Sequence, residues 1–165
     1  GVSKQAAQQR WPSGVTDRFT NRARSILVRA QEDARTRRHQ QIGTEHLLLG
    51  MLEEAQGIAA RVVAALAGSA ERGTAAAAAR MPADGLGNPP TRIPYSPQSK
   101  AALDSACRHA QALGHDFVGT EHLLLGLFDA GGPAAAALAD LKITPAAAHA
   151  EIIKQLEKLG VPSAG

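Results

Sequence analysis

The octapeptide Gly-Thr-Glu-His-Leu-Leu-Leu-Gly occupies residues 43–50, and the identical octapeptide occupies residues 119–126. Eight consecutive identities in a chain of 165 residues indicate an internal duplication, and self-similarity at a fixed spacing is typical of a repeat architecture. The same spacing of 76 residues aligns Phe19 with Tyr95. The duplication therefore starts well before the octapeptide.

Each copy begins with a pattern that predicts a long amphipathic helix. Apolar residues recur at steps of three and four through residues 19–34 and again through residues 95–110, which places them on one helical face. Thr20 and Ser96 stand where a hydroxyl is expected to cap the helix N-terminus. Gly114 suits the position just after the end of the second of these helices.

The octapeptide predicts the start of a second helix in each copy. Thr44 and Thr120 are the expected N-caps. Glu45 and Glu121 then fall in the first turn, where the helix dipole favours a carboxylate. The three leucines of each octapeptide are expected to enter the core.

Shorter patterns complete each copy. A third helix is expected at about residues 57–66 and 132–141, and a fourth over the alanine run after Gly73 and from Thr144 to near Gly160. The chain is 44% hydrophobic but only 3% aromatic, so Ala, Leu, Ile and Val must pack helices closely. The sequence therefore predicts an all-α fold with four helices in each repeat.

The repeat also divides the chain. Residues 82–92 are rich in Pro and Gly, cannot continue a helix and predict an exposed linker. Residues 1–16 lie outside the repeat and show no sustained period. The expected organisation is an N-terminal extension (1–16), a first repeat (17–81), a linker (82–92), a second repeat (93–160) and a tail (161–165).

Cysteine content and charge restrict the class of protein. The single cysteine, Cys107, excludes an internal disulfide framework and favours the cytoplasm. No stretch reaches the roughly 18 apolar residues of a membrane span, so no membrane association is expected. Residues 1–76 carry 11 Lys/Arg against 7 Asp/Glu. Seven arginines spread around the first predicted helix instead of forming one stripe, which favours a solvated surface over a nucleic-acid-binding one: Arg18, Arg22, Arg24, Arg29, Arg35, Arg37 and Arg38.

Three stretches together resemble the N-terminal domain of the ClpC branch of AAA+ unfoldases. They are residues 17–23 (Asp-Arg-Phe-Thr-Asn-Arg-Ala), the two octapeptides, and residues 93–97 (Ile-Pro-Tyr-Ser-Pro). The resemblance covers about residues 17–160, and the high content of Ala, Arg and Gly looks actinobacterial. It implies a pseudo-twofold bundle of eight helices that docks protein substrates or adaptors, including arginine-phosphorylated proteins, for an unfoldase and its Clp protease.

Enzymatic activity is not expected. The chain has no Gly-x-x-x-x-Gly-Lys-Ser/Thr phosphate loop and no visible nucleophile–base pair, and no cofactor is implied. The chain is either a domain of a larger unfoldase or a free-standing Clp N-domain protein. Residues 1–16 favour the second, because unfoldases that it resembles begin almost at the Arg-Phe-Thr segment.

The resemblance also implies two sites for phosphorylated arginine. A glutamate of each octapeptide holds the guanidinium through two hydrogen bonds, and cap hydroxyls and amides at a helix N-terminus receive the phosphate. The alternative is that the glutamates only complement their helix dipoles and the threonines only cap. The expected ligand-binding residues are Thr20, Thr44, Glu45, Ser96, Thr120 and Glu121.

The histidines raise the question of a metal site. His46 and His122 follow the two glutamates, and His39 and His115 are equivalent residues before them. Their spacing fits no His-Glu-x-x-His helix, so helix-end or core histidines are favoured and no metal is expected. Cys107 is expected to be a packing residue.

Phe19 and Tyr95 are equivalent aromatics at the starts of the two long helices. Core anchoring is the favoured interpretation. The alternative is an apolar surface where, the resemblance implies, adaptors bind and, in actinobacterial members, cyclic-peptide antibiotics such as cyclomarin. The leading hypothesis is thus a binding module for a Clp protease. The alternatives are a free-standing decoy that sequesters such antibiotics and, least favoured, an arginine-rich nucleic-acid-binding protein.

Overall fold

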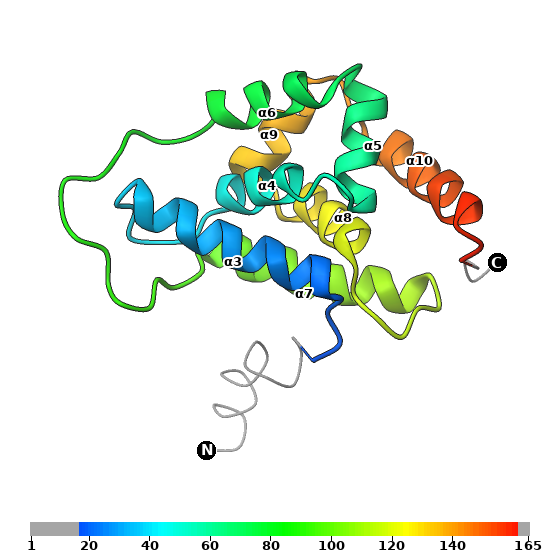
Figure 1. Cartoon of the computed structure of the whole chain (residues 1–165), viewed down its shortest axis with the longest axis horizontal. Helices are drawn as coiled ribbons and strands as arrows, with labels where there is room; N and C mark the ends of the chain where they lie inside the picture. Colours follow the sequence, from blue (N-terminus) through cyan, green and yellow to red (C-terminus); the bar gives the residue numbers. More distant parts are fainter. Residues whose placement is uncertain (1–16, 162–165) are drawn as a thin grey trace.

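The computed structural model describes residues 17–161, which form a bundle of eight helices (Figure 1). The first repeat contains α3 (Asn21–Thr36), α4 (Thr44–Glu53), α5 (Ile58–Ala67) and α6 (Ala70–Ala79). The second contains α7 (Pro97–Ala112), α8 (Thr120–Ala130), α9 (Gly132–Asp140) and α10 (Pro145–Lys158). The all-α prediction with four helices per repeat is confirmed. The N-terminal extension (1–16) and residues 162–165 of the expected tail lie outside the described residues.

Most helix starts follow the sequence signals. Thr20 and Ser96 cap α3 and α7, each accepting a hydrogen bond of 3.1 Å from the backbone N–H three residues later. The fourth helix of the first repeat begins earlier than expected, at Ala70 instead of after Gly73. The reason is a cap at Ser69, whose hydroxyl accepts from the N–H of Arg72 (3.2 Å).

Two equivalent helix pairs form the centre of the fold. α3 packs against α4, and α7 packs against α8. The last glycine of each octapeptide lies at the crossing. A methyl group at Gly50 would stand 3.0 Å from the carbonyl oxygen of Ile26, and one at Gly126 would clash with the carbonyl oxygen of Ala102. These glycines therefore set how closely the helices of each pair approach.

The outer helices join the repeats. α6 packs against α9, and α10 packs against α5 (Figure 1). Buried side chains of both repeats form one continuous core. Within residues 17–161 no single helix has both the length and the apolar character needed to cross a bilayer; α8 and α9 would pass together, but they meet at a bend of 98°.

Two short bridges connect the starts of helices across the repeats. Phe19, just before α3, pairs with Val118, just before α8, and Tyr95, just before α7, pairs with Ile42, just before α4. Both bridges are parallel. Each long helix therefore begins beside the octapeptide helix of the other repeat.

The linker is held on the first repeat. The Arg35 guanidinium donates to the carbonyl oxygen of Thr91 (2.8 Å), and the N–H of Gly85 donates to the carbonyl oxygen of Arg37 (2.9 Å). Most of its side chains are exposed. Residues 82–92 thus run along the end of α3 with an anchored backbone.

Both long helices are followed by a residue in the left-handed conformation. Gly114 has φ +74° after α7, as predicted, but its counterpart after α3 is Arg38, with φ +59°. A side chain costs about 1 kcal/mol in this conformation. We expect Arg38→Gly to raise the free energy of unfolding by about 1 kcal/mol and Gly114→Ala to lower it by a similar amount, as measured by urea denaturation. A less stable Arg38→Gly variant would contradict this account.

Candidate functional site

The N-cap of each octapeptide helix is glycine. α4 begins after Gly43 and α8 after Gly119, so the prediction that the adjoining threonines are the N-caps is wrong by one residue. A methyl group at Gly43 would clash with the carboxylate of Glu45, and one at Gly119 with that of Glu121. Each carboxylate folds back over its helix N-terminus, and only a residue without a Cβ leaves that space open.

The two threonine hydroxyls cap helices of the opposite repeat. The N–H of Ala134 in α9 donates to Thr44 Oγ1 (3.2 Å), and the N–H of Ala59 in α5 donates to Thr120 Oγ1 (3.0 Å). These amides belong to first helical turns, which have no partner within their own helix. Thr44 and Thr120 therefore stabilise the contact between repeats.

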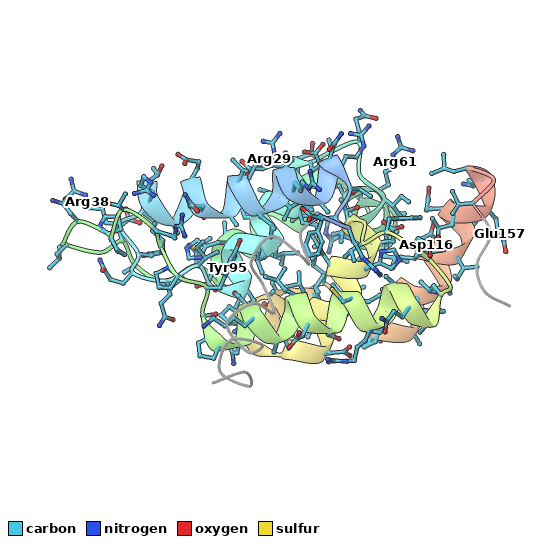
Figure 2. All side chains as sticks on the ribbon, turned by 90° about the horizontal axis from the view of Figure 1, so that it is seen from below. Arg29, Arg38, Arg61, Tyr95, Asp116 and Glu157 are labelled. Carbon is cyan, nitrogen blue, oxygen red and sulfur yellow. The ribbon has the colours of Figure 1, made fainter. Side chains whose placement is uncertain are left out.

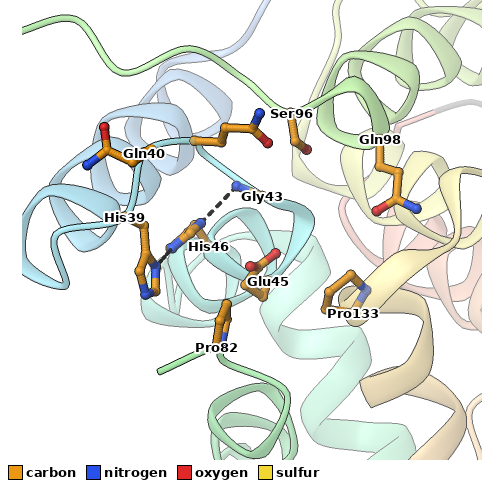
Figure 3. Close-up of a pocket in the computed structure, with 10 residues that line it drawn as sticks. His39, Gln40, Gly43, Glu45, His46, Pro82, Ser96, Gln98 and Pro133 are labelled. Atoms are coloured by element: carbon orange, nitrogen blue, oxygen red, sulfur yellow. Dashed lines mark hydrogen bonds between the residues drawn. The ribbon is translucent and has the colours of Figure 1, made fainter. Parts of the chain in front are cut away.

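His46 and His122 complete the octapeptide helix N-termini. The Nδ1 of each ring accepts a hydrogen bond of 2.8 Å from the N–H of the cap glycine. The Nε2 lies 2.8 Å from Nδ1 of His39 in the first repeat and 2.9 Å from Nδ1 of His115 in the second. Figure 3 shows this chain in the first repeat. The prediction of helix-end histidines is confirmed.

Burial keeps these two histidines neutral. It lowers the pKa of His46 to about 4 and that of His122 to about 3. Because Nδ1 accepts from the glycine, the proton of the neutral ring is on Nε2, which donates to the second histidine of each pair. Each octapeptide helix N-terminus is thus completed by a neutral acceptor.

One group of side chains has the composition of a metal site. Ligand atoms of His115, Glu121 and His122 lie within 4.8 Å of one another. Both ring nitrogens of His122 are used in hydrogen bonds, and a metal ion would have to displace its contact with His115. The arrangement therefore fits a hydrogen-bonded chain better than a metal centre.

The two glutamates line separate pockets between the repeats. The Glu45 pocket, of about 350 Å³, includes Ser96 at the start of α7 (Figure 3). The Glu121 pocket, of about 460 Å³, includes Thr20 at the start of α3. The parallel bridges produce this arrangement, and each carboxylate therefore shares a pocket with a cap residue of the other repeat.

Both carboxylates are buried, and neither forms an ion pair with a lysine or arginine of the described residues, although His115 lies near Glu121. Glu45 is 7% exposed and Glu121 is 3% exposed. Within residues 17–161 no ion pair joins either one to a lysine or arginine. Burial raises the pKa of Glu121. Because an unpaired buried charge is costly, the pockets favour a ligand that supplies a cation.

Comparison with known proteins identifies the family. The family model of the Clp repeat (R) N-terminal domain matches residues 18–141 and again residues 95–164. The chain belongs to this family. The chloroplastic chaperone protein ClpC of Pisum sativum is 35% identical over 156 residues, which cover 93% of this Clp N-domain and 17% of that protein. The chloroplastic ClpA homolog CD4B of Solanum lycopersicum is 35% identical over 146 residues, 88% of this chain and 16% of that protein.

Solved structures share the Clp N-domain fold. The N-terminal domain of ClpD from Arabidopsis thaliana has a TM-score of 0.68 at 21% identity, covering 88% of this chain and 99% of that one. The Hsp104 N-terminal domain from Candida albicans has a TM-score of 0.72 at 19% identity, covering 83% and 90%. A complex of the ClpV N-domain with a VipB peptide has a TM-score of 0.59 at 18% identity, covering 70% and 71%. These proteins give no support to an actinobacterial affinity, which stays a prediction.

Phe19 and Tyr95, the two equivalent aromatics, both pack on the core. Phe19 is 4% exposed and belongs to the core, so it offers no surface to a cyclic peptide. Tyr95 is partly buried against the core, and burial raises its pKa. Cys107 also packs against the core, and burial raises the pKa of its thiol. Core anchoring is therefore the correct interpretation for Phe19.

Sequence analysis missed two arginines of the Glu121 pocket. Arg22 and Arg61 both line it. Aligning the repeats could have revealed them, because the offset of 76 residues places Gln98 opposite Arg22, and the offset of 75 after the octapeptides places Ala136 opposite Arg61. The signal in the sequence is the difference in charge between these equivalent positions of the two repeats.

Proposed function

We propose that this Clp N-domain is a binding module for protein substrates or adaptors of a Clp unfoldase, and that phosphorylated arginine is a group it recognises. The observation that carries the proposal is the pair of buried carboxylates, Glu45 and Glu121, that line open pockets and form no ion pair with a lysine or arginine within residues 17–161. A guanidinium supplies the missing charge through two parallel hydrogen bonds.

The helix N-terminus of the other repeat suits the phosphate of the same ligand. Thr20 and Ser96 stand at the positive ends of α3 and α7, where an anion is favoured. One phosphorylated arginine would then place its cationic part on a buried carboxylate and its anionic part beside a cap hydroxyl. Such a ligand bridges the two repeats.

Family membership supports a role in protein recognition. The matching relatives are a chaperone protein and an ATP-binding subunit of a Clp protease, and the ClpV N-domain is known in complex with a peptide. In our proposal the bound segment is delivered to an AAA+ unfoldase, and this domain carries out no chemical step.

The direct test replaces both carboxylates with isosteric amides. We expect the Glu45→Gln/Glu121→Gln variant to bind free phosphoarginine at least about tenfold more weakly in calorimetric titration, because a charge-assisted hydrogen bond is lost. The free energy of unfolding without ligand should be unchanged or higher, because an unpaired buried charge is removed.

Glu53→Gln is the matched control. Glu53 is an exposed glutamate at the end of α4, so this variant makes the same kind of substitution once, outside both pockets. Its affinity for phosphoarginine should equal that of the wild type. Equal binding by the double variant and the wild type would refute the proposed role of the carboxylates.

A further inference from the structure

The two pockets are related by the repeat but differ in charge. The Glu121 pocket contains Arg22 and Arg61, whereas the lining of the Glu45 pocket contains no lysine or arginine. Gln98 stands in place of Arg22, and Ala136 in place of Arg61. Figure 2 shows Arg61 at the surface, at the same end of the bundle as Asp116.

The cap hydroxyls of the two pockets also differ. The Ser96 hydroxyl donates to Ser99 Oγ (3.1 Å), which in turn donates to the carbonyl oxygen of Ile42 (2.7 Å). The counterpart of Ser99 in the first repeat is Ala23, which has no hydroxyl. Ala23 cannot accept a hydrogen bond from the Thr20 hydroxyl. The Thr20 hydroxyl can therefore donate its proton to a ligand in the Glu121 pocket.

A third difference lies in the helix that begins beside each pocket. Ile58 is the first residue of α5 and lines the Glu121 pocket, whereas its counterpart Pro133, which lines the Glu45 pocket, has no N–H to offer a ligand. The amide oxygen of Gln98 lies against Gly132 at the start of α9. An acceptor atom therefore lies beside the N-terminus of α9, where an anion would otherwise be favoured.

The two arginines can turn toward a ligand at little cost. Arg22 Nη1 lies 3.2 Å from Glu54 Oε1, and Arg61 Nη2 lies 3.1 Å from Gln56 Oε1. The side chain of Arg22 is 53% exposed in this pair. Exposed pairs of this kind contribute little to stability, and a doubly charged phosphate is a stronger partner.

We infer that the Glu121 pocket alone binds phosphorylated arginine, and that the Glu45 pocket accepts at most an unphosphorylated guanidinium. This inference rests on the proposed function and adds to it the assignment of the pocket that binds the phosphate. The reason is that two arginines and a cap hydroxyl free to donate line one pocket, whereas a glutamine, a cap hydroxyl that already donates to Ser99 and a proline line the other.

The test is calorimetric titration of the full chain with free phosphoarginine, together with amide NMR spectra. We expect one binding site, a ligand-induced shift of the Gly119 amide and an unshifted Gly43 amide. Arg22→Gln/Arg61→Ala gives the Glu121 pocket the residues of its counterpart. We expect each of the two substitutions to weaken the binding of phosphoarginine by the protein at least about tenfold. Both arginine side chains are exposed, so the fold should be retained, which a thermal melt verifies.

The reverse exchange supplies the complementary result. Gln98→Arg/Ser99→Ala gives the Glu45 pocket an arginine and a free cap hydroxyl, and a second phosphoarginine site should appear, reported by the Gly43 amide. Two equal sites in the wild type, one of them removed by Glu45→Gln, would overturn the inference and leave the proposed function intact. No binding of phosphoarginine by the wild type would overturn both. Unchanged affinity in Arg22→Gln/Arg61→Ala would overturn the inference alone.

Discussion

Acidification from pH 7 to pH 4.5 is expected to lower the free energy of unfolding by about 2 to 3 kcal/mol for each of His46 and His122. Burial holds the pKa of these rings at about 4 and about 3 in the folded state, below the ordinary value of 6.5. Between the two pKa values, these rings are therefore protonated in the unfolded chain but stay neutral in the folded chain. The stabilisation is complete above pH 6.5 and is lost as the pH falls toward the folded values. Urea denaturation at a series of pH values measures it.

One nearby group opposes this loss. Burial raises the pKa of Glu121, so the folded chain takes up a proton there more readily than the unfolded chain. Its contribution to stability therefore grows as the pH falls, and the net loss in the second repeat is smaller than that from His122 alone. Around His46, Asp33 favours the protonated ring, whereas His39 and Arg37 disfavour it.

The matched control removes the titration but keeps the cap. His46→Gln/His122→Gln places at each position a side chain that can accept the N–H of the cap glycine without binding a proton. We expect this variant to be less stable at pH 7, because the contacts with His39 and His115 change. Its stability should nevertheless depend only weakly on pH between 6.5 and 4.5. A slope as steep as that of the wild type would assign the acid sensitivity to other groups.

Gly126→Ala is expected to lower the free energy of unfolding by about 2 to 3 kcal/mol. The added methyl group would clash with the carbonyl oxygen of Ala102 and stand 3.1 Å from the backbone nitrogen of Ala106, so α7 and α8 must separate. The gain in helix propensity of about 1 kcal/mol offsets only part of this cost. Urea denaturation gives the value.

Gly50→Ala is the equivalent change in the first repeat. Its methyl group would lie 3.0 Å from the nearest backbone atom, the carbonyl oxygen of Ile26, so the required shift is smaller. We expect a loss of about 1 kcal/mol or less, because the gain in propensity nearly balances the strain. Equal losses in the two variants would contradict the closer approach of the helices at Gly126.

Local signals predicted most of the helices and some of the caps. The hydroxyls of Thr20 and Ser96 and the left-handed Gly114 act where the sequence places them, because each depends only on its own turn of backbone. The predicted N-cap of each octapeptide helix is one residue too late, because threonine is the better N-cap by propensity. The folded-back carboxylate and the histidine acceptor make Gly43 the cap instead.

The octapeptide was enough to show that the chain has two similar halves, each with a helix that begins with a threonine, a glutamate and a histidine. The pairing of Glu45 with Ser96 and of Glu121 with Thr20 in one pocket each, and the capping of a helix of the opposite repeat by Thr44 and by Thr120, depend on how the two halves pack together. A helical period specifies which face of a helix is buried. It does not specify which repeat that face packs against, because the two repeats are similar and either could supply the partner helix. The choice between those partners was made by packing and by the parallel bridges that carry each long helix to the other repeat.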